Sequence, residues 1–199
     1  MIKVSESKLH WNYFLALERD ADTVSRYIEF TSRNFRTHSI ELARILFAAA
    51  AEVDVIARTL CTILAPARRA DRITEYRSII VTHLPQLARE RVYVSRYGLT
   101  LYPWSSWRKR KAPENPVWWR AYNQVKHHRS SQFEQANLHH TLNSMAGLLL
   151  MNYFYYMEQM RPQWGANGEL REKDVTAALE PESTLFRLNE DYYFSRLVE

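Results

Sequence analysis

The strongest helical pattern in this chain covers residues 40–64, and it limits what the chain can fold into. Its sequence, IELARILFAAAAEVDVIARTLCTIL, holds no glycine and no proline. Ser39 precedes it as the expected N-cap, Glu41 falls in its first turn, and Pro66 follows shortly after its end. The whole chain has only four glycines, which argues against a turn-rich all-β fold. The pattern therefore favours packed helices.

Two further helices are predicted in the first half of the chain. Apolar residues recur at helical spacing from about Lys8 to Phe30. Asp71 is the expected cap of a shorter helix, which ends before Pro85. Together with residues 40–64, these segments predict an antiparallel helical bundle.

The helical pattern breaks at about residues 91–102. Apolar positions there alternate with Tyr, Ser or Thr on both sides of Gly98, in the sequence RVYVSRYGLTLY. Alternation of this kind around a glycine predicts a short β-hairpin. The expected fold class is therefore mainly α, an antiparallel helical bundle with one short β-hairpin insertion. Residues 1–162 would form the bundle, and residues 163–199 a C-terminal helical extension.

Helical signals return after the hairpin. Asn115-Pro116 is expected to supply the cap and first turn of a helix. Ser131–Glu134 has the spacing of a capping box, which predicts a bend at Ser130 and a restarted helix that stops at Pro162. The tail from about Glu169 is expected to hold one amphipathic helix and a looser aromatic end.

Composition restricts the setting in which the protein acts. The net charge of +5 and the sequence pI of about 9.3 favour an anionic partner. Cys61 is the only cysteine and lies in an apolar run, so we expect a buried packing residue and a reducing cytoplasm. Glu52 and Asp54 interrupt the richest apolar run, so we expect a soluble protein with no membrane span.

Groups that bind anions and transfer protons gather within residues 117–129, VWWRAYNQVKHHR. On a helix, Arg120, Asn123 and His127 share one side at spacing i, i+3 and i+7, with Lys126 toward the flank. The opposite side holds Trp118, Tyr122 and Val125. Any amphipathic helix shows such a division, so this pattern alone favours an ordinary helix with a solvated polar face.

The same segment carries a resemblance to a known family. Arg120, six further residues and His127 match the arginine–x(4–6)–histidine motif of the HEPN superfamily of small helical bundles. The longer string WxxYNxVKHxR, residues 119–129, resembles a set of uncharacterised bacterial HEPN-like proteins. The neighbouring LYPW and FEQANL, and THSIELARILFAAAAEVDVIARTLC, are similar to that pattern too. The resemblance covers roughly residues 8–160.

The resemblance implies a homodimer in which the two motifs face each other, and cleavage of RNA without metal or other cofactor. It implies that His127 acts as acid or base and that Arg120 binds the phosphate. It also implies that Asn123 and Lys126 position the substrate, with Arg129 as a further RNA-binding cation. The setting it suggests is phage defence or a toxin–antitoxin system, with an antitoxin or other protein as partner.

One position departs from the catalytic members of the family. These carry a polar residue directly after the arginine, where this chain has Ala121. A non-catalytic HEPN-like module that binds nucleic acid or protein is therefore the alternative function. A second alternative is that Asn123 and His127 form the functional polar pair, with Arg120 only solvated.

Two other groups of residues are candidates for the site. Glu52 lies at the edge of the apolar face of its helix and needs a partner. It either orients the site by pairing with Lys126, Arg129 or His127, or forms an ordinary structural ion pair. Arg108, Lys109 and Arg110 follow Trp104 and Trp107 closely, a mixture of aromatic and cationic residues that suits RNA. The alternative is a solvated basic loop beside core tryptophans.

Overall fold

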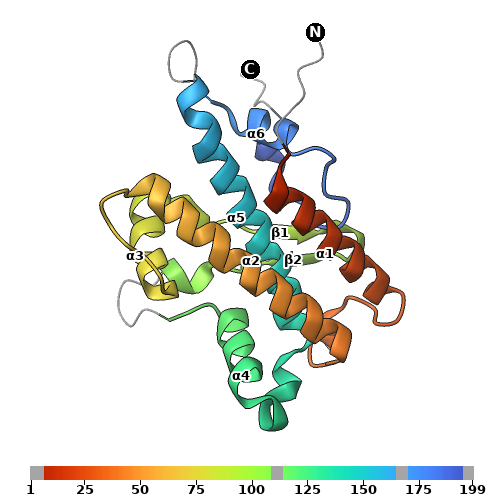
Figure 1. Cartoon of the computed structure of the whole chain (residues 1–199). Coiled ribbons are helices and arrows are strands. Elements are labelled where there is room, and N and C mark those ends of the chain that lie inside the picture. Colours follow the sequence, from red (N-terminus) through yellow and green to blue (C-terminus); the bar gives the residue numbers. More distant parts are fainter. Residues whose placement is uncertain (1–6, 109–113, 165–169, 195–199) are drawn as a thin grey trace.

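The computed structural model of the chain describes residues 7–108, 114–164 and 170–194 (Figure 1). Its helices and strands follow in the order α1 (Leu9–Ser25), α2 (Ile40–Leu64), α3 (Ile73–His83), β1 (Val92–Val94), β2 (Leu99–Leu101), α4 (Val117–Gln132), α5 (Leu138–Trp164) and α6 (Glu172–Ala178). Single turns of 3-10 helix, including η4 (Ser105–Arg108) and η5 (Phe133–Gln135), lie between them, and one more, η6 (Glu190–Tyr192), follows α6. The predicted mainly helical fold with one short hairpin is confirmed.

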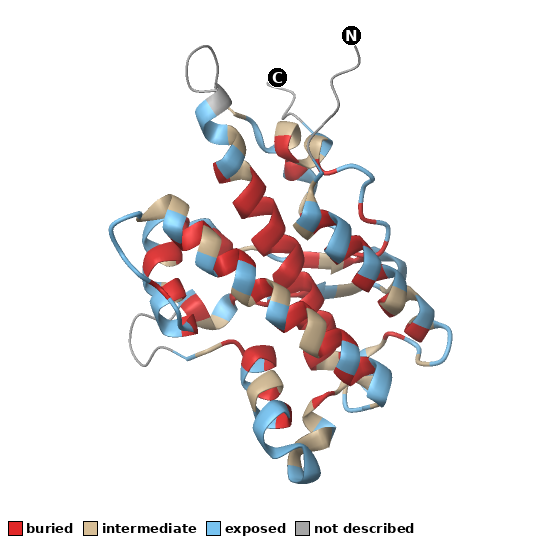
Figure 2. Cartoon of the chain, viewed as in Figure 1, coloured by how far each residue is buried: buried red, intermediate tan, exposed pale blue. Residues whose placement is uncertain are grey.

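The centre of the molecule is α5, and α2 crosses in front of it with α1 and α3 on either side (Figure 1). Every residue of α5 from His140 to Tyr156 is buried, as Figure 2 also shows. A helix buried all round forms the core against which the others pack. None of the described helices is both long enough and apolar enough to cross a bilayer.

The N-cap of α2 and the β-hairpin lie where the sequence predicts them. The hydroxyl of Ser39 accepts a hydrogen bond of 3.1 Å from the amide of Leu42, and caps α2. The two strands pair antiparallel, with Val92 opposite Leu101. Gly98 joins them with φ of 62°, a conformation that favours glycine. The predicted cap and hairpin are therefore confirmed.

Helix boundaries differ from the prediction in several places. Pro116 and not Asn115 is the N-cap residue of α4, and α5 runs past Pro162 to Trp164. At α3 the carboxylate of Glu75 accepts the amides of Asp71 (2.8 Å) and Arg72 (3.0 Å), whereas the carboxylate of Asp71 pairs with Arg69. The bend in α4 falls at His128, with φ −136° and ψ 44°, not at Ser130.

The restart into α5 also differs, because Asn137 replaces Ser131 as the cap. Its Oδ1 accepts a hydrogen bond of 3.1 Å from the amide of His140. A single 3-10 turn, η5, occupies the segment in which the capping box was expected. At the starts of both α3 and α5, a nearby polar side chain reaches the free amides better than the predicted one.

The C-terminal residues 170–194 pack on the bundle and contribute to its core. Val175, Phe186 and Tyr192 belong to the same buried cluster as α1, α2 and α5. Arg187 forms a backbone bridge to Tyr93 of the hairpin.

Candidate nucleic-acid interface on α4

Tryptophan packing fixes the beginning of α4. Trp118 lies in a buried cluster with Trp104 and Trp107, and the centres of the Trp118 and Trp104 rings are 5.2 Å apart. The indole nitrogen of Trp118 donates to the carbonyl of Pro103 at 2.9 Å, and that of Trp104 to Gly147 of α5 at 3.3 Å. The first turn of α4 is therefore held by the core.

A second, smaller cluster holds the middle of α4 against α2. Val125 is fully buried beside Leu46 and Ala43. The rings of Tyr122 and Phe47 pack edge to face, with their centres 5.2 Å apart. With one side of the helix held in this way, the opposite side faces outward.

The outward side of α4 carries the residues of the arginine–histidine motif. Arg120 and His127 are exposed and Asn123 is half-buried. The Asn123 amide nitrogen donates to the carbonyl of Trp119 at 2.9 Å, so it is partly occupied within its own helix. Seven residues along a helix correspond to about 10 Å between Arg120 and His127. We call these three residues the α4 ridge.

Lys126 and Arg129 point to the flank of α4 that faces α2. The Lys126 ammonium lies 5.5 Å from the ring centre of Tyr122, and the Arg129 guanidinium 5.4 Å from that of Phe47. Such contacts leave the charges of these groups accessible while burying their stems. These two cations therefore border the α4 ridge rather than join it.

The charge of α4 is unbalanced. Its sequence contains no Asp or Glu. Within the described ranges, Arg120, Lys126, His127 and Arg129 show no ion pair with a carboxylate. Among the described residues, the arginines observed in ion pairs lie on other elements and include Arg44, Arg58, Arg69, Arg96, Arg161, Arg171 and Arg187. An uncompensated cationic helix face attracts anions.

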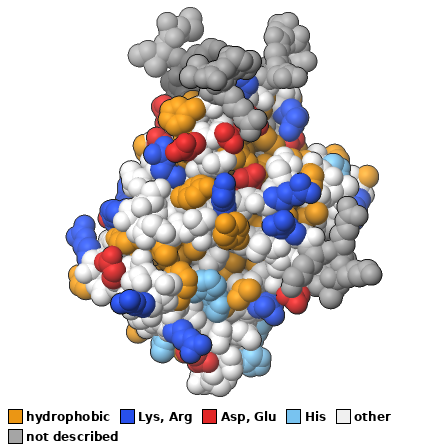
Figure 3. Space-filling model, turned by 180° about the vertical axis from the view of Figure 1, so that it is seen from behind, with side chains coloured by type: hydrophobic (Ala, Val, Ile, Leu, Met, Phe, Trp, Pro, Cys, Tyr) orange, Lys and Arg blue, Asp and Glu red, His pale blue; other side chains and the backbone are white. Residues whose placement is uncertain are grey.

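Arg120 also lies close to the buried start of α5. The pKa of His140 is lowered, mainly by burial and in part by the positive charge of Arg120. Burial lowers the pKa of the neighbouring His139 as well. Both imidazoles are therefore neutral near pH 7. On the rear face, histidine side chains gather at the end of the molecule where α4 lies (Figure 3).

Glu52 contacts α1 and not α4. Its carboxylate lies 2.5 Å from Nδ1 of His10, and both side chains are only 16% exposed. The predicted orienting role toward Lys126, Arg129 or His127 has no support in these contacts. Glu52 forms the ordinary structural pair that was the alternative.

The tryptophans before the basic run are core residues. Trp104 and Trp107 are 0% and 1% exposed, so neither presents a ring on which a base can stack. Arg108 is exposed at the end of η4. Lys109 and Arg110 lie outside the described residues. The alternative of core tryptophans is therefore correct for these two rings.

Two cavities near α4 gave no clear signal in the sequence. One, of about 240 Å³, lies beside the first turn of α4 and includes Phe35 and His139. The other is an apolar groove of about 980 Å³ between α1, α2 and α4, bordered by Tyr13, Phe47 and Arg129. Residues from distant parts of the chain line both cavities, so no local sequence motif predicts them.

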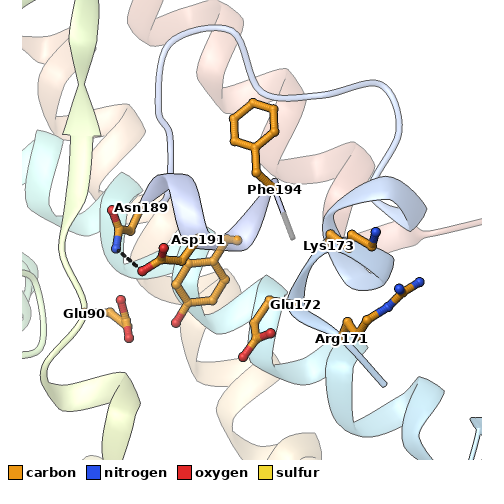
Figure 4. A pocket seen from close by; sticks show the side chains of 8 residues that line it. Glu90, Arg171, Glu172, Lys173, Asn189, Asp191 and Phe194 are labelled. Carbon is orange, nitrogen blue, oxygen red and sulfur yellow. Dashed lines mark hydrogen bonds between the residues drawn. The ribbon is translucent and has the colours of Figure 1, made fainter. Parts of the chain in front are cut away.

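A further cavity, of about 500 Å³, lies at the opposite end of the molecule, beside α6 and η6 (Figure 4). Glu90, Glu172 and Asp191 line it together with Arg171 and Lys173. Burial raises the pKa of Glu90 above its ordinary value. The charges in this lining are of both signs, and none of its residues was predicted as a site.

Comparison of the chain with protein-family models, curated proteins and solved structures finds no match. Within the described ranges, no group of three or more His, Cys, Asp or Glu side chains is placed to hold a metal ion.

Proposed function

We propose that this chain is a metal-independent endoribonuclease of the HEPN type, and that RNA binds at the α4 ridge. The observation that supports the proposal is the exposure of Arg120 and His127 on one face of a helix without acidic residues. A guanidinium free of carboxylates is available for a phosphate, and an exposed imidazole is available for proton transfer.

The proposed reaction is an internal transfer at phosphorus. His127 takes the proton of a ribose 2′-hydroxyl, and the 2′-oxygen forms a bond to the adjacent phosphorus. The bond to the 5′-oxygen breaks, which leaves a 2′,3′-cyclic phosphate and a 5′-hydroxyl once that oxygen is protonated. Arg120 stabilises the charge on the non-bridging oxygens. His127 of a second copy is the acid for the leaving oxygen in a homodimer.

A non-catalytic module that binds nucleic acid or protein is the second candidate, and one observation favours it. Ala121 is 1% exposed and packs in the core. The position after Arg120 therefore has no room for the polar group of catalytic relatives. In this alternative the α4 ridge binds an anionic partner without cutting it, and a role in defence or with an antitoxin requires no cleavage.

A cleavage assay in EDTA separates the two candidates. Purified protein is incubated with a mixed RNA pool, alongside Arg120→Ala and His127→Ala. A nuclease cuts RNA, leaves cyclic phosphate ends, spares substrates with 2′-deoxyribose, and loses cutting in both variants. His83→Ala, on α3, is the control that keeps activity.

Intact RNA with salt-sensitive binding supports the module instead. Absence of both cleavage and RNA binding contradicts the nuclease and the nucleic-acid-binding module, and leaves only a module that binds protein. Light scattering tests the dimer separately, because a monomer would remove the composite site and the second His127.

A further inference from the structure

Aromatic side chains line the cavity beside the first turn of α4. Phe35 and His139 form one wall, with ring centres 4.9 Å apart and planes at 44°. Trp118 lines the buried part, and Tyr102 is 48% exposed on the hairpin side. Aromatic walls of this kind favour a flat ring over a branched aliphatic group.

Polar groups with free hydrogen-bonding capacity line the same cavity. The hydroxyl of Ser106 is buried and has no hydrogen-bond partner among the described residues. Buried hydroxyls normally have a partner, so the hydrogen-bonding capacity of this one is unmet. Asn143 donates its amide nitrogen to the carbonyl of His139 at 2.9 Å, which leaves its Oδ1 to accept.

His139 adds a third hydrogen-bonding group. Burial lowers the pKa of this imidazole, so near pH 7 the ring is neutral, with one nitrogen that donates and one that accepts. Together with Ser106 and Asn143 it offers donors and acceptors within one small cavity, as the edge of a nucleobase requires.

Three exposed arginines lie close in the chain to residues that line the cavity. Arg120 follows the lining residue Val117 by one helical turn. Arg36 follows Phe35 in the chain, and Arg108 ends the turn that carries Ser106. All three arginines are exposed, and none forms an ion pair with a described carboxylate.

We propose that this cavity binds one nucleobase of the RNA whose phosphate lies on Arg120. The inference rests on the proposed function for the identity of the polymer, and it adds a base-binding subsite to the α4 ridge. The cavity of about 240 Å³ is smaller than the about 300–1,000 Å³ typical of drug-sized ligands, which suits one base and not two. Ser106 and Asn143 would read the edge of the base, and Tyr102 would cover its face.

Calorimetric titration tests the subsite without any cleavage step. The probes are AMP, GMP, CMP and UMP, with ribose 5-phosphate as the matched compound that lacks a base. At least one nucleotide is expected to bind about tenfold more tightly than ribose 5-phosphate, from base–aromatic stacking.

Two variants then locate the binding. Ser106→Ala removes a hydroxyl with no described partner, and Tyr102→Ala removes an exposed ring, so both should fold. Each is expected to weaken nucleotide binding about fivefold or more, without changing the binding of ribose 5-phosphate. Tyr27→Ala, which removes a ring that is 83% exposed elsewhere, is the control.

The outcomes separate the subsite from the nuclease. Nucleotides that bind no better than ribose 5-phosphate, or that bind both variants normally, overturn the base-binding subsite even if RNA is cleaved. Base-dependent binding that both variants lose supports the subsite even if RNA stays intact, in which case the nuclease proposal alone fails.

Discussion

The indole of Trp118 lies directly against Gly147, so the start of α4 depends on the missing side chain of one residue in α5. A methyl group added at Gly147 would lie 3.0 Å from Cζ2 of Trp118 and 3.5 Å from Cζ2 of Trp104. The first distance is shorter than normal van der Waals contact. The contact lets α4, with its ridge, dock on the core.

Gly147→Val is expected to lower the free energy of unfolding by about 1–3 kcal/mol, because the added carbons must displace two buried indoles. Helix propensity works in the opposite direction, since valine is a better helix former than glycine. Urea unfolding measures the change. The control, Ala51→Val on the exposed side of α2, should stay within about 0.5 kcal/mol of the parent. A Gly147 variant as stable as the control would contradict the packing argument.

A buried carboxylate ties the C-terminal residues to α1. Glu18 is 4% exposed and accepts the amides of Leu185 (2.9 Å) and Phe186 (3.2 Å), as well as the hydroxyl of Ser183. Glu18→Leu leaves these donors without their acceptor, and should cost at least about 2 kcal/mol of unfolding free energy.

The same Glu18 variant should be cut faster by protease within residues 183–194. Glu41→Leu, on the exposed side of α2, is the matched control for loss of a carboxylate and should be cut at the parental rate. Equal rates in both variants would show that Glu18 does not hold the C-terminal residues in place.

Much of the fold was predictable because its signals are local. Helix α2 begins after Ser39 and ends before Pro66, as these residues predict, and the alternation around Gly98 corresponds to the hairpin. The misplaced caps show the limit of such reasoning. Asp71 and Glu75 are both near the start of α3, and only the folded backbone decides which carboxylate reaches the free amides.

The candidate site was predictable to the extent that one helix carries it. The division of α4 into a buried and an exposed side follows from its period, and Arg120 and His127 lie on the exposed side. The partner of Glu52 was not predictable, because His10 reaches it only through the packing of α1 on α2. The cavity of Phe35 and His139 is likewise a product of tertiary contacts.

Cys61 is expected to stay unreactive in the folded protein. It is 1% exposed, and burial raises the pKa of its thiol to about 12, so almost no thiolate exists near pH 8. A thiol reagent such as DTNB should therefore modify it only as fast as the chain unfolds. Modification at the rate of a free cysteine in native buffer would contradict this burial.

RNA binding, with or without cleavage, is expected to weaken with salt through the cations of α4. Lys126→Gln should lower affinity for single-stranded RNA, and should reduce the slope of log affinity against log salt by about 0.7. The charge acts because no described carboxylate neutralises it. Fluorescence anisotropy at several salt concentrations measures both quantities.

Arg69→Gln is the matched control for that measurement. It removes the same charge from an exposed arginine that pairs with Asp71 in the loop before α3. If both variants change the slope equally, RNA is attracted by the net charge of the protein and not by α4.

The buried imidazoles predict a loss of stability in mild acid. The pKa of His140 lies below its ordinary value of about 6.5, first because of burial. Between that lowered pKa and about 6.5 the unfolded chain binds more protons than the folded one, so the free energy of unfolding falls as the pH falls. His140→Gln should flatten this dependence between about pH 7.5 and about pH 5.5. Thr141→Val, a buried neighbour without a titrating group, should keep the parental dependence, and an unchanged curve for His140→Gln would contradict the assignment.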